Sequence, residues 1–176
     1  MRYNIFNTVH LPLKNALITN CLGVSDLPNQ SYASSARTLN NLEELLRVFN
    51  EQIDYEKLYV FPFIFDYEPS VWNNYITEHM RAASVANNLK NLIRTYCKAN
   101  NAEDKTNLKK AIIRSYNEFV LFNFNHMDDE EAVLNEILWR YYPDEVLIQI
   151  EEKMEILPRL IGQSPQKTEF KVASAA

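Results

Sequence analysis

Residues 122–134 read FNFNHMDDEEAVL and combine helical spacing with the side chains of a metal site. His126 is followed four residues later by Glu130. On a helix that turns ~100° per residue, these side chains lie ~40° apart, so both can point into one cavity. An imidazole and a carboxylate together suit iron, zinc or manganese. The stretch therefore predicts a long helix that carries part of a metal site.

The three-and-four spacing of apolar residues around this stretch recurs along the chain, as expected for amphipathic helices. Four long helices with mostly short connections favour an all-α, up-down-up-down four-helix bundle with an additional short C-terminal helix. The bundle and this fifth helix would occupy residues 1–157, and residues 158–176 would form a C-terminal tail. The predicted helices are 7–22, 36–61, 69–99, a fourth from the turn at 100–104 to 139, and 144–157.

Two boundaries depend on particular residues. Asn7 or Thr8 is expected to cap the first helix, and Gly23 is expected to end it. A loop over residues 24–35 would follow, because Ser, Asp, Pro and Asn cluster there.

Composition limits the class of protein. The 176 residues are 47% hydrophobic and 23% charged, with only two glycines, which suits a single domain of few long elements. A net charge of −5 without a basic stripe gives no support to binding of nucleic acid or an anionic membrane. No apolar run is long enough to span a bilayer, and no signal sequence is evident, so a cytoplasmic location is expected. Cys21 and Cys97 fit no metal motif and are expected to be buried free thiols.

The positions of the three histidines favour one shared site. In an antiparallel bundle, residues equidistant from a turn lie at one level. Glu56 and His79 are nearly equidistant from the second turn, and His79 and His126 from the third. His10 fits less well, because the second helix would overhang the first by ~10 Å at ~1.5 Å per residue. The long loop would have to absorb this difference.

These residues resemble the hemerythrin-like, HHE cation-binding family over about residues 3–157. The resemblance is carried by five motifs, taken in their order and spacing. They are YNIFN leading to His10, Tyr55-Glu56 with Val60-Phe61-Pro62, Glu78-His79, the HMDDEE of residues 126–131, and LWRYY with Asp144-Glu145. The last motif resembles a branch of this family whose members have an additional C-terminal helix.

The resemblance implies a non-haem di-iron centre held by five histidines and two bridging carboxylates. Oxygen binding, redox or iron sensing, storage and nitric oxide handling are the activities that it implies. His10, His79 and His126 match histidine positions, Glu56 matches the carboxylate of the second helix, and Glu130 or Glu131 matches that of the fourth. Two histidines are missing: Gln52, a weak ligand at best, and Ala83 stand in their places. The expected cofactor is therefore an iron pair, a single metal ion or none, with dioxygen as the small ligand if metal is bound.

Other classes fit less well. Ferritin-like centres need Glu-x-x-His pairs, and Asn7, Ile76 and Asn123 stand where those glutamates would be. No nucleophile, base and orienter converge, so an enzyme is not favoured. The main alternative is a metal-free bundle that acts as an interaction or structural protein. Its apolar stretches near Phe63 and Phe119 would then be partner surfaces, and a homodimer would fit either interpretation.

Overall fold

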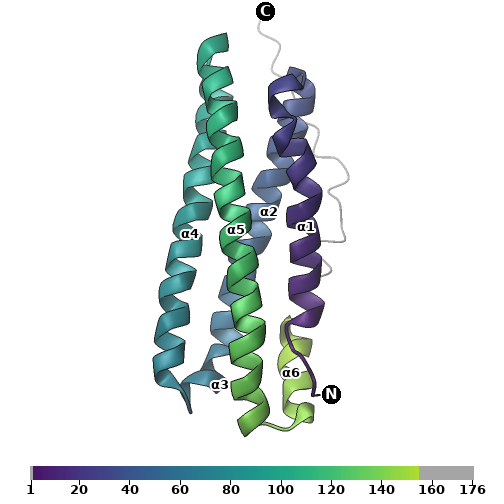
Figure 1. Cartoon of the computed structure of the whole chain (residues 1–176), viewed down its shortest axis with the longest axis vertical. Helices are drawn as coiled ribbons and strands as arrows, with labels where there is room; N and C mark the ends of the chain where they lie inside the picture. The colour runs from purple at the N-terminus through teal and green to yellow at the C-terminus, as the bar shows by residue number, and fades with distance from the viewer. Residues whose placement is uncertain (1, 155–176) are drawn as a thin grey trace, which may run out of the picture.

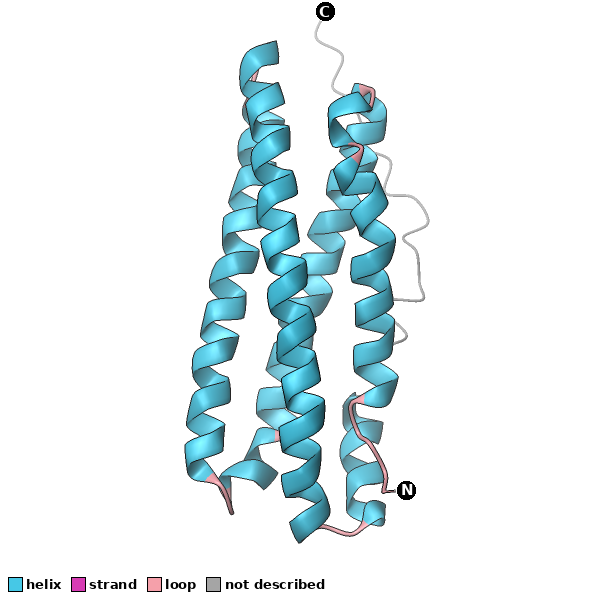
Figure 2. Ribbon diagram, in the orientation of Figure 1, coloured by secondary structure: helices cyan, strands magenta, loops and turns pink. Residues whose placement is uncertain are grey.

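The computed structural model describes residues 2–154, and within that range the protein is all-helical (Figure 2). The prediction of an all-α fold is confirmed for this part of the chain. The predicted tail, and the last three residues of the predicted fifth helix, lie outside the described residues. The elements are α1 (Asn7–Ser25), the short 3₁₀ helix η1 (Leu27–Asn29), α2 (Tyr32–Tyr59), α3 (Phe61–Phe65), α4 (Pro69–Lys98), α5 (Ala102–Tyr141) and α6 (Asp144–Met154).

The four long helices lie side by side along the long axis of the molecule and form a helical bundle (Figure 1). Contacts run from α1 to α2, from α2 to α4, from α4 to α5 and from α5 back to α1, so each helix has two neighbours. The α1–α2 and α4–α5 connections lie at the upper end of Figure 1, and α3 lies at the lower end between α2 and α4. None of the described helices has the length and apolar character needed to cross a bilayer.

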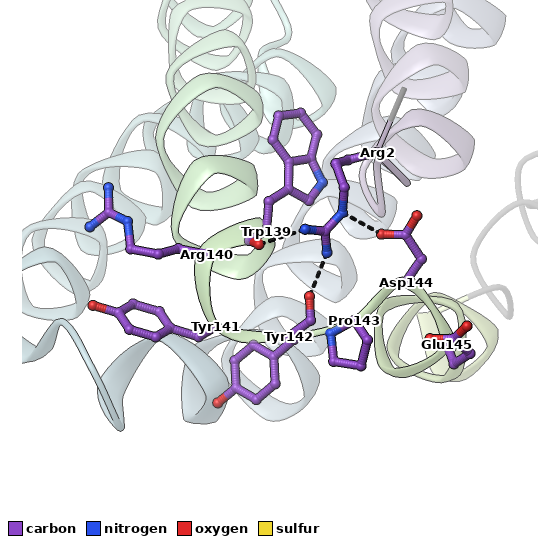
Figure 3. Close-up of a pocket in the computed structure, with 8 residues that line it drawn as sticks. All are labelled: Arg2, Trp139, Arg140, Tyr141, Tyr142, Pro143, Asp144 and Glu145. Carbon is purple, nitrogen blue, oxygen red and sulfur yellow. Dashed lines mark hydrogen bonds and ion pairs between the residues drawn. The ribbon is translucent and has the colours of Figure 1, made fainter.

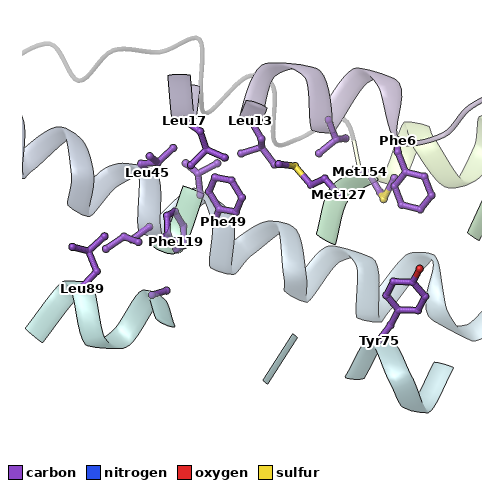
Figure 4. Packing of buried hydrophobic residues seen from close by; sticks show 14 of the residues in the cluster. Phe6, Leu13, Leu17, Leu45, Phe49, Tyr75, Leu89, Phe119, Met127 and Met154 are labelled. Atoms are coloured by element: carbon purple, nitrogen blue, oxygen red, sulfur yellow. The ribbon is translucent and has the colours of Figure 1, made fainter. Parts of the chain in front are cut away.

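The core is built from the apolar faces that the spacing predicted. Phe49 of α2 packs edge-on against Phe119 of α5, with ring centroids 5.1 Å apart (Figure 4). Phe119 is only 1% exposed, so its own ring belongs to the core, and the partner surfaces expected near Phe63 and Phe119 stay a prediction. Leu121, two residues later, is 64% exposed and points away from the core. The expectation of two buried thiols also fails, because Cys97 is exposed and Cys21 is half-buried.

The first helix is longer than predicted, and the loop after it is shorter. Gly23 lies inside α1 and does not end it; its carbonyl, in the last turn of the helix, accepts a hydrogen bond from the side chain of Gln30. Part of the predicted loop forms η1. The helix α2 then begins four residues before the predicted start, because the hydroxyl of Ser31 caps it by accepting the N–H of Ser34.

Other caps also differ from prediction. Neither Asn7 nor Thr8 caps α1; the residue at the cap is Phe6, whose N–H is bound by the Asn4 side chain. The helix α5 begins at Ala102, within the predicted turn, because Asn101 accepts the N–H of Asp104. Pro69 begins α4 as predicted, at a position where its missing N–H costs nothing.

The N-terminal segment is tied to the junction between α5 and α6. Arg2 donates hydrogen bonds to the carboxylate of Asp144 at 2.7 Å and to the carbonyl oxygens of Trp139 and Tyr142 (Figure 3). These carbonyls are at the end of α5, where the helix itself supplies no donors. The indole of Trp139 in turn donates to the carbonyl of Tyr3. These bonds fix the start of α1 and so the height of His10.

The helix α6 is held by a buried carboxylate. Glu151 is 4% exposed and accepts hydrogen bonds from the hydroxyls of Thr8 and Tyr3. Thr8 thus binds α6 and leaves the cap of α1 to other groups. The bonds to Glu151 hold α6 beside the first turn of α1, two residues before His10.

Candidate metal centre

All four long helices place side chains at one level of the bundle. His10 comes from α1, Glu56 from the last turn of α2, His79 from α4, and His126 and Glu130 from α5. These side chains are buried, and the most exposed of the five, His126, is 6% exposed. The expected common height of Glu56, His79 and His126 agrees with these contacts, and His10 reaches the same level.

The Nε2 atoms of two histidines face the carboxylates of Glu56 and Glu130. For His79, Nε2 lies 3.3 Å from Oε2 of Glu56 and 3.2 Å from Oε1 of Glu130. For His126, Nε2 lies 3.3 Å from the same Glu130 oxygen. The two imidazoles therefore share one side of the carboxylate pair.

His10 lies on the other side of the pair. Its Nε2 atom is 3.2 Å from Oε1 of Glu56 and 3.6 Å from Oε2 of Glu130. Each carboxylate thus presents one oxygen toward His10 and the other toward His79. Two carboxylates placed in this way can bridge a pair of cations.

Two of the three histidines have a second carboxylate behind the ring. Nδ1 of His10 lies 3.1 Å from Glu131, and Nδ1 of His126 lies 2.8 Å from Glu78. Histidines that bind a metal through one nitrogen commonly donate the other N–H to a carboxylate, which fixes the tautomer and the ring orientation. Of the two adjacent glutamates on α5, Glu130 faces the Nε2 atoms and Glu131 lies behind His10.

An aromatic ring lies against each imidazole, a feature that the sequence analysis missed. Phe6 stacks on His10 at 4.8 Å, Phe61 on His79 at 5.0 Å, and Phe122 on His126 at 6.0 Å between centroids. A signal was present, because an aromatic residue precedes every histidine by four positions: Phe6, Tyr75 and Phe122. In two of the three cases that residue is the one that stacks. These rings restrict the imidazole orientations.

The two positions without histidine have different surroundings. Gln52 is buried and donates its amide N–H to Oε1 of Glu56 at 2.5 Å, and its own Oε1 atom has no hydrogen-bond partner. Its side chain therefore lies on the His10 side of the carboxylate pair. Ala83, one turn after His79, brings no ligand atom.

The charges of the site are strongly interdependent. Burial alone would lower the pKa of His10 and of His79, but hydrogen bonds to the surrounding carboxylates raise both to about 9. Although burial alone would raise the pKa of Glu56, both histidines hold it well below its usual range. The hydrogen bond from His10, together with that from Lys14, lowers the pKa of Glu131 to about 2. The carboxylates therefore favour the protonated forms of His10 and His79, and a metal ion would have to displace those protons.

The residues on the His79 side fit a metal ion. Glu56, His79, His126 and Glu130 each offer one ligand atom, and these atoms all lie within 4.8 Å of one another. At metal–ligand bonds of ~2.1 Å, adjacent ligand atoms lie ~3 Å apart and opposite ones ~4.2 Å, so little contraction is needed.

Buried polar atoms without a hydrogen-bond partner are concentrated in this cluster. Seven buried side-chain atoms of the described residues lack a hydrogen-bond partner, and four of them belong to this cluster. One is Nε2 of His126, which approaches Glu130 without hydrogen-bond geometry. Such groups are costly to bury, and a cation bound on the His79 side would satisfy this nitrogen. Oε2 of Glu130 and Oε1 of Gln52 lie on the His10 side of the carboxylate pair. The fourth atom, Nδ1 of His79, is not the ring nitrogen that faces the carboxylates.

Comparison of the chain with family models, with curated proteins and with solved structures finds no match in any of the three. The resemblance read from the motifs therefore stays a prediction, and function is inferred from the geometry of the site.

Proposed function

We propose that this protein is a hemerythrin-like metal-binding bundle, in which α1, α2, α4 and α5 form the up-down-up-down four-helix core and α6 is the additional C-terminal helix. The observation that carries the proposal is the placement of Glu56 and Glu130, whose carboxylates each face His10 with one oxygen and His79 with the other. A mixed set of imidazole and carboxylate ligands suits non-haem iron. A role in oxygen, redox or iron sensing, or in iron storage, follows from such a centre.

The two metal positions are unequal. The position on the His79 side has two imidazoles and one oxygen from each carboxylate. The position on the other side has His10, the remaining carboxylate oxygens and the amide of Gln52, which binds iron less well than imidazole. We therefore infer that the first ion binds between His79 and His126, and that the second position fills only at higher metal concentration.

Bound iron would supply redox chemistry and open coordination positions for a small ligand such as dioxygen. The chain's own residues hold and orient the site. Glu78 and Glu131 fix the rings of His126 and His10, and the stacked rings of Phe6, Phe61 and Phe122 restrict the orientations of the three imidazoles.

Elemental analysis tests the proposal. Protein expressed with added iron should hold about one ion per chain, and Glu130→Gln should lose most of it, because Glu130 faces all three imidazoles. Glu136→Gln is the matched control, since Glu136 lies on the same helix with an exposed side chain. Only trace iron, zinc and manganese in the unaltered protein, after incubation with each metal, would contradict a metal-binding function.

One observation favours a metal-free bundle as the second candidate. The imidazoles and carboxylates already form ion pairs with one another, so the cluster can balance its charge without a cation. On that candidate, a strong chelator would leave the melting temperature unchanged. A metal-binding protein would be destabilised by chelation, because an ion that binds only the folded state stabilises it.

A further inference from the structure

A pocket away from the metal centre lies where the α1–α2 connection meets the start of α5. Figure 1 shows these segments at the upper end of the bundle. The pocket has a volume of about 340 Å³, within the range of small-molecule sites. Its walls come from η1, α2, α4 and α5, and they include three lysines and two tyrosines. These are Tyr32, Tyr96, Lys105, Lys109 and Lys110, together with the hydroxyl of Thr106.

Among residues 2–154, no acidic side chain forms an ion pair with the lysines of this Lys/Tyr pocket, and no carboxylate lines it. The lysines that form ion pairs in the described part of the chain are Lys14 and Lys57, both elsewhere. Two acidic residues of the first turn of α5, Glu103 and Asp104, are exposed and lie outside the lining, and Asp104 is bound to the side chain of Asn101. In a protein with a net charge of −5, three lysines around one hollow make a local positive site.

The tyrosine rings give the pocket aromatic walls. Nζ of Lys105 lies 5.1 Å from the centroid of Tyr32 and 5.9 Å from that of Tyr96, so both rings are close to its ammonium group. Lys109 donates one hydrogen bond to the carbonyl of Gln30, which leaves two N–H donors free. A cation–π contact is weaker than a charged hydrogen bond between a cation and an anion. The ammonium group of Lys105 can therefore leave the tyrosine rings to bind an anion that enters the pocket.

We propose that the Lys/Tyr pocket binds a small molecule that carries both an aromatic ring and a phosphate group, the chemical class of nucleoside monophosphates. The lysines would bind the phosphate as point charges, Thr106 would donate its hydroxyl, and the exposed ring of Tyr32 would stack on the base. A long nucleic acid is a poorer fit, because the basic surface is one small pocket on a protein of net negative charge. A metal ion is excluded, since the lining offers no carboxylate, imidazole or thiol.

The test is a calorimetric titration of the full-length protein with each of three ligands: adenosine monophosphate, adenosine and inorganic phosphate. The monophosphate should bind at least ~10-fold more tightly than either part alone, because only it uses both the lysines and the rings. Lys105→Gln with Lys109→Gln should weaken its binding by ~10-fold or more, since each lysine supplies a charged hydrogen bond. Tyr32→Leu should reduce the preference for the monophosphate over phosphate.

Lys153→Gln is the control, because this lysine is exposed on α6 at the other end of the bundle. It should bind the monophosphate as the unaltered protein does. Equal binding of phosphate and monophosphate, or no effect of the double lysine substitution, would overturn the proposal. So would the absence of binding at millimolar concentration. Circular dichroism of each variant verifies that it is folded.

Discussion

The carboxylate of Glu78 lies 2.8 Å from Nδ1 of His126, on the opposite side of the ring from the nitrogen that faces Glu130. Glu78 is partly exposed and lines a groove of about 330 Å³ between α4 and α5, together with Phe122 and Arg81. His126 thus stands between this groove and the buried carboxylates. The groove is the side from which the site is closest to solvent.

The first prediction concerns this contact. Glu78→Gln should weaken metal binding at the His79–His126 position by ~10-fold, because the charge that orients and polarises His126 is lost. Competition with a coloured chelator measures the affinity. Glu118→Gln is the matched control, since Glu118 lines the same groove without a bond to the histidine. Equal affinities for the two variants would show that Glu78 has no part in metal binding.

The missing histidines give the second prediction. Gln52→His should raise the metal content from about one ion per chain toward two, because Gln52 is already next to Glu56 on the His10 side. Elemental analysis after incubation with iron provides the measurement. Asn88→His is a suitable control, since it adds an imidazole to α4 away from the site. If both variants hold the same amount of metal, the second position does not exist.

Stability against pH gives the third prediction. The pKa values of His10 and His79 are raised from 6.5 to about 9 in the folded, metal-free protein. A raised pKa means that protonation favours the folded state, so this contribution is complete below pH 6.5 and is lost as pH rises to about 9. The melting temperature of chelator-treated protein should fall across that window.

Metal binding should have the opposite dependence on pH. Binding needs neutral imidazoles, so affinity should increase as pH rises toward the same values, with release of protons that an unbuffered titration can detect. A metal-free protein whose melting temperature is constant between pH 6.5 and about 9 would contradict the charge state assigned to the two histidines.

The fourth prediction separates core from surface on one helix. Phe119→Ala should lower the free energy of unfolding by ~3–5 kcal/mol, because it removes a buried ring and leaves a cavity against Phe49. Leu121→Ala, at a position 64% exposed, should change it by less than ~0.5 kcal/mol. Denaturant unfolding at several protein concentrations would measure both. A large, concentration-dependent loss for Leu121→Ala would instead place that residue in a subunit interface.

Helix spacing and distance from the turns were enough to place much of this site. The apolar faces of α2 and α5 follow the predicted periodicity, and Glu56, His79 and His126 meet as their positions along the helices require. These inferences succeed because helical rise and angle are nearly constant from one residue to the next. An error of one or two residues in the position of a turn changes the predicted height of a side chain by only a few ångströms.

Features that depend on single side-chain bonds were not predictable. The carbonyl of Gly23 near the end of α1 is bound by the side chain of Gln30, and the hydroxyl of Ser31 caps the start of α2. Likewise, Glu130 and Glu131 are neighbours in sequence, and the packing of α1 against α5 decides which one faces Nε2 of His10 and which one faces Nδ1. Such choices belong to tertiary structure, which local pattern does not record.

The span of the site along the chain has a consequence for biosynthesis. His10 and Glu131 are in contact although 121 residues separate them, and the cluster draws on all four long helices. A chain still emerging from the ribosome has no such site until α5 has been made and has folded back onto α1. On the proposed function, metal loading would follow the synthesis of α5, and a chain truncated before His126 would lack two of the four ligands on the His79 side, His126 and Glu130.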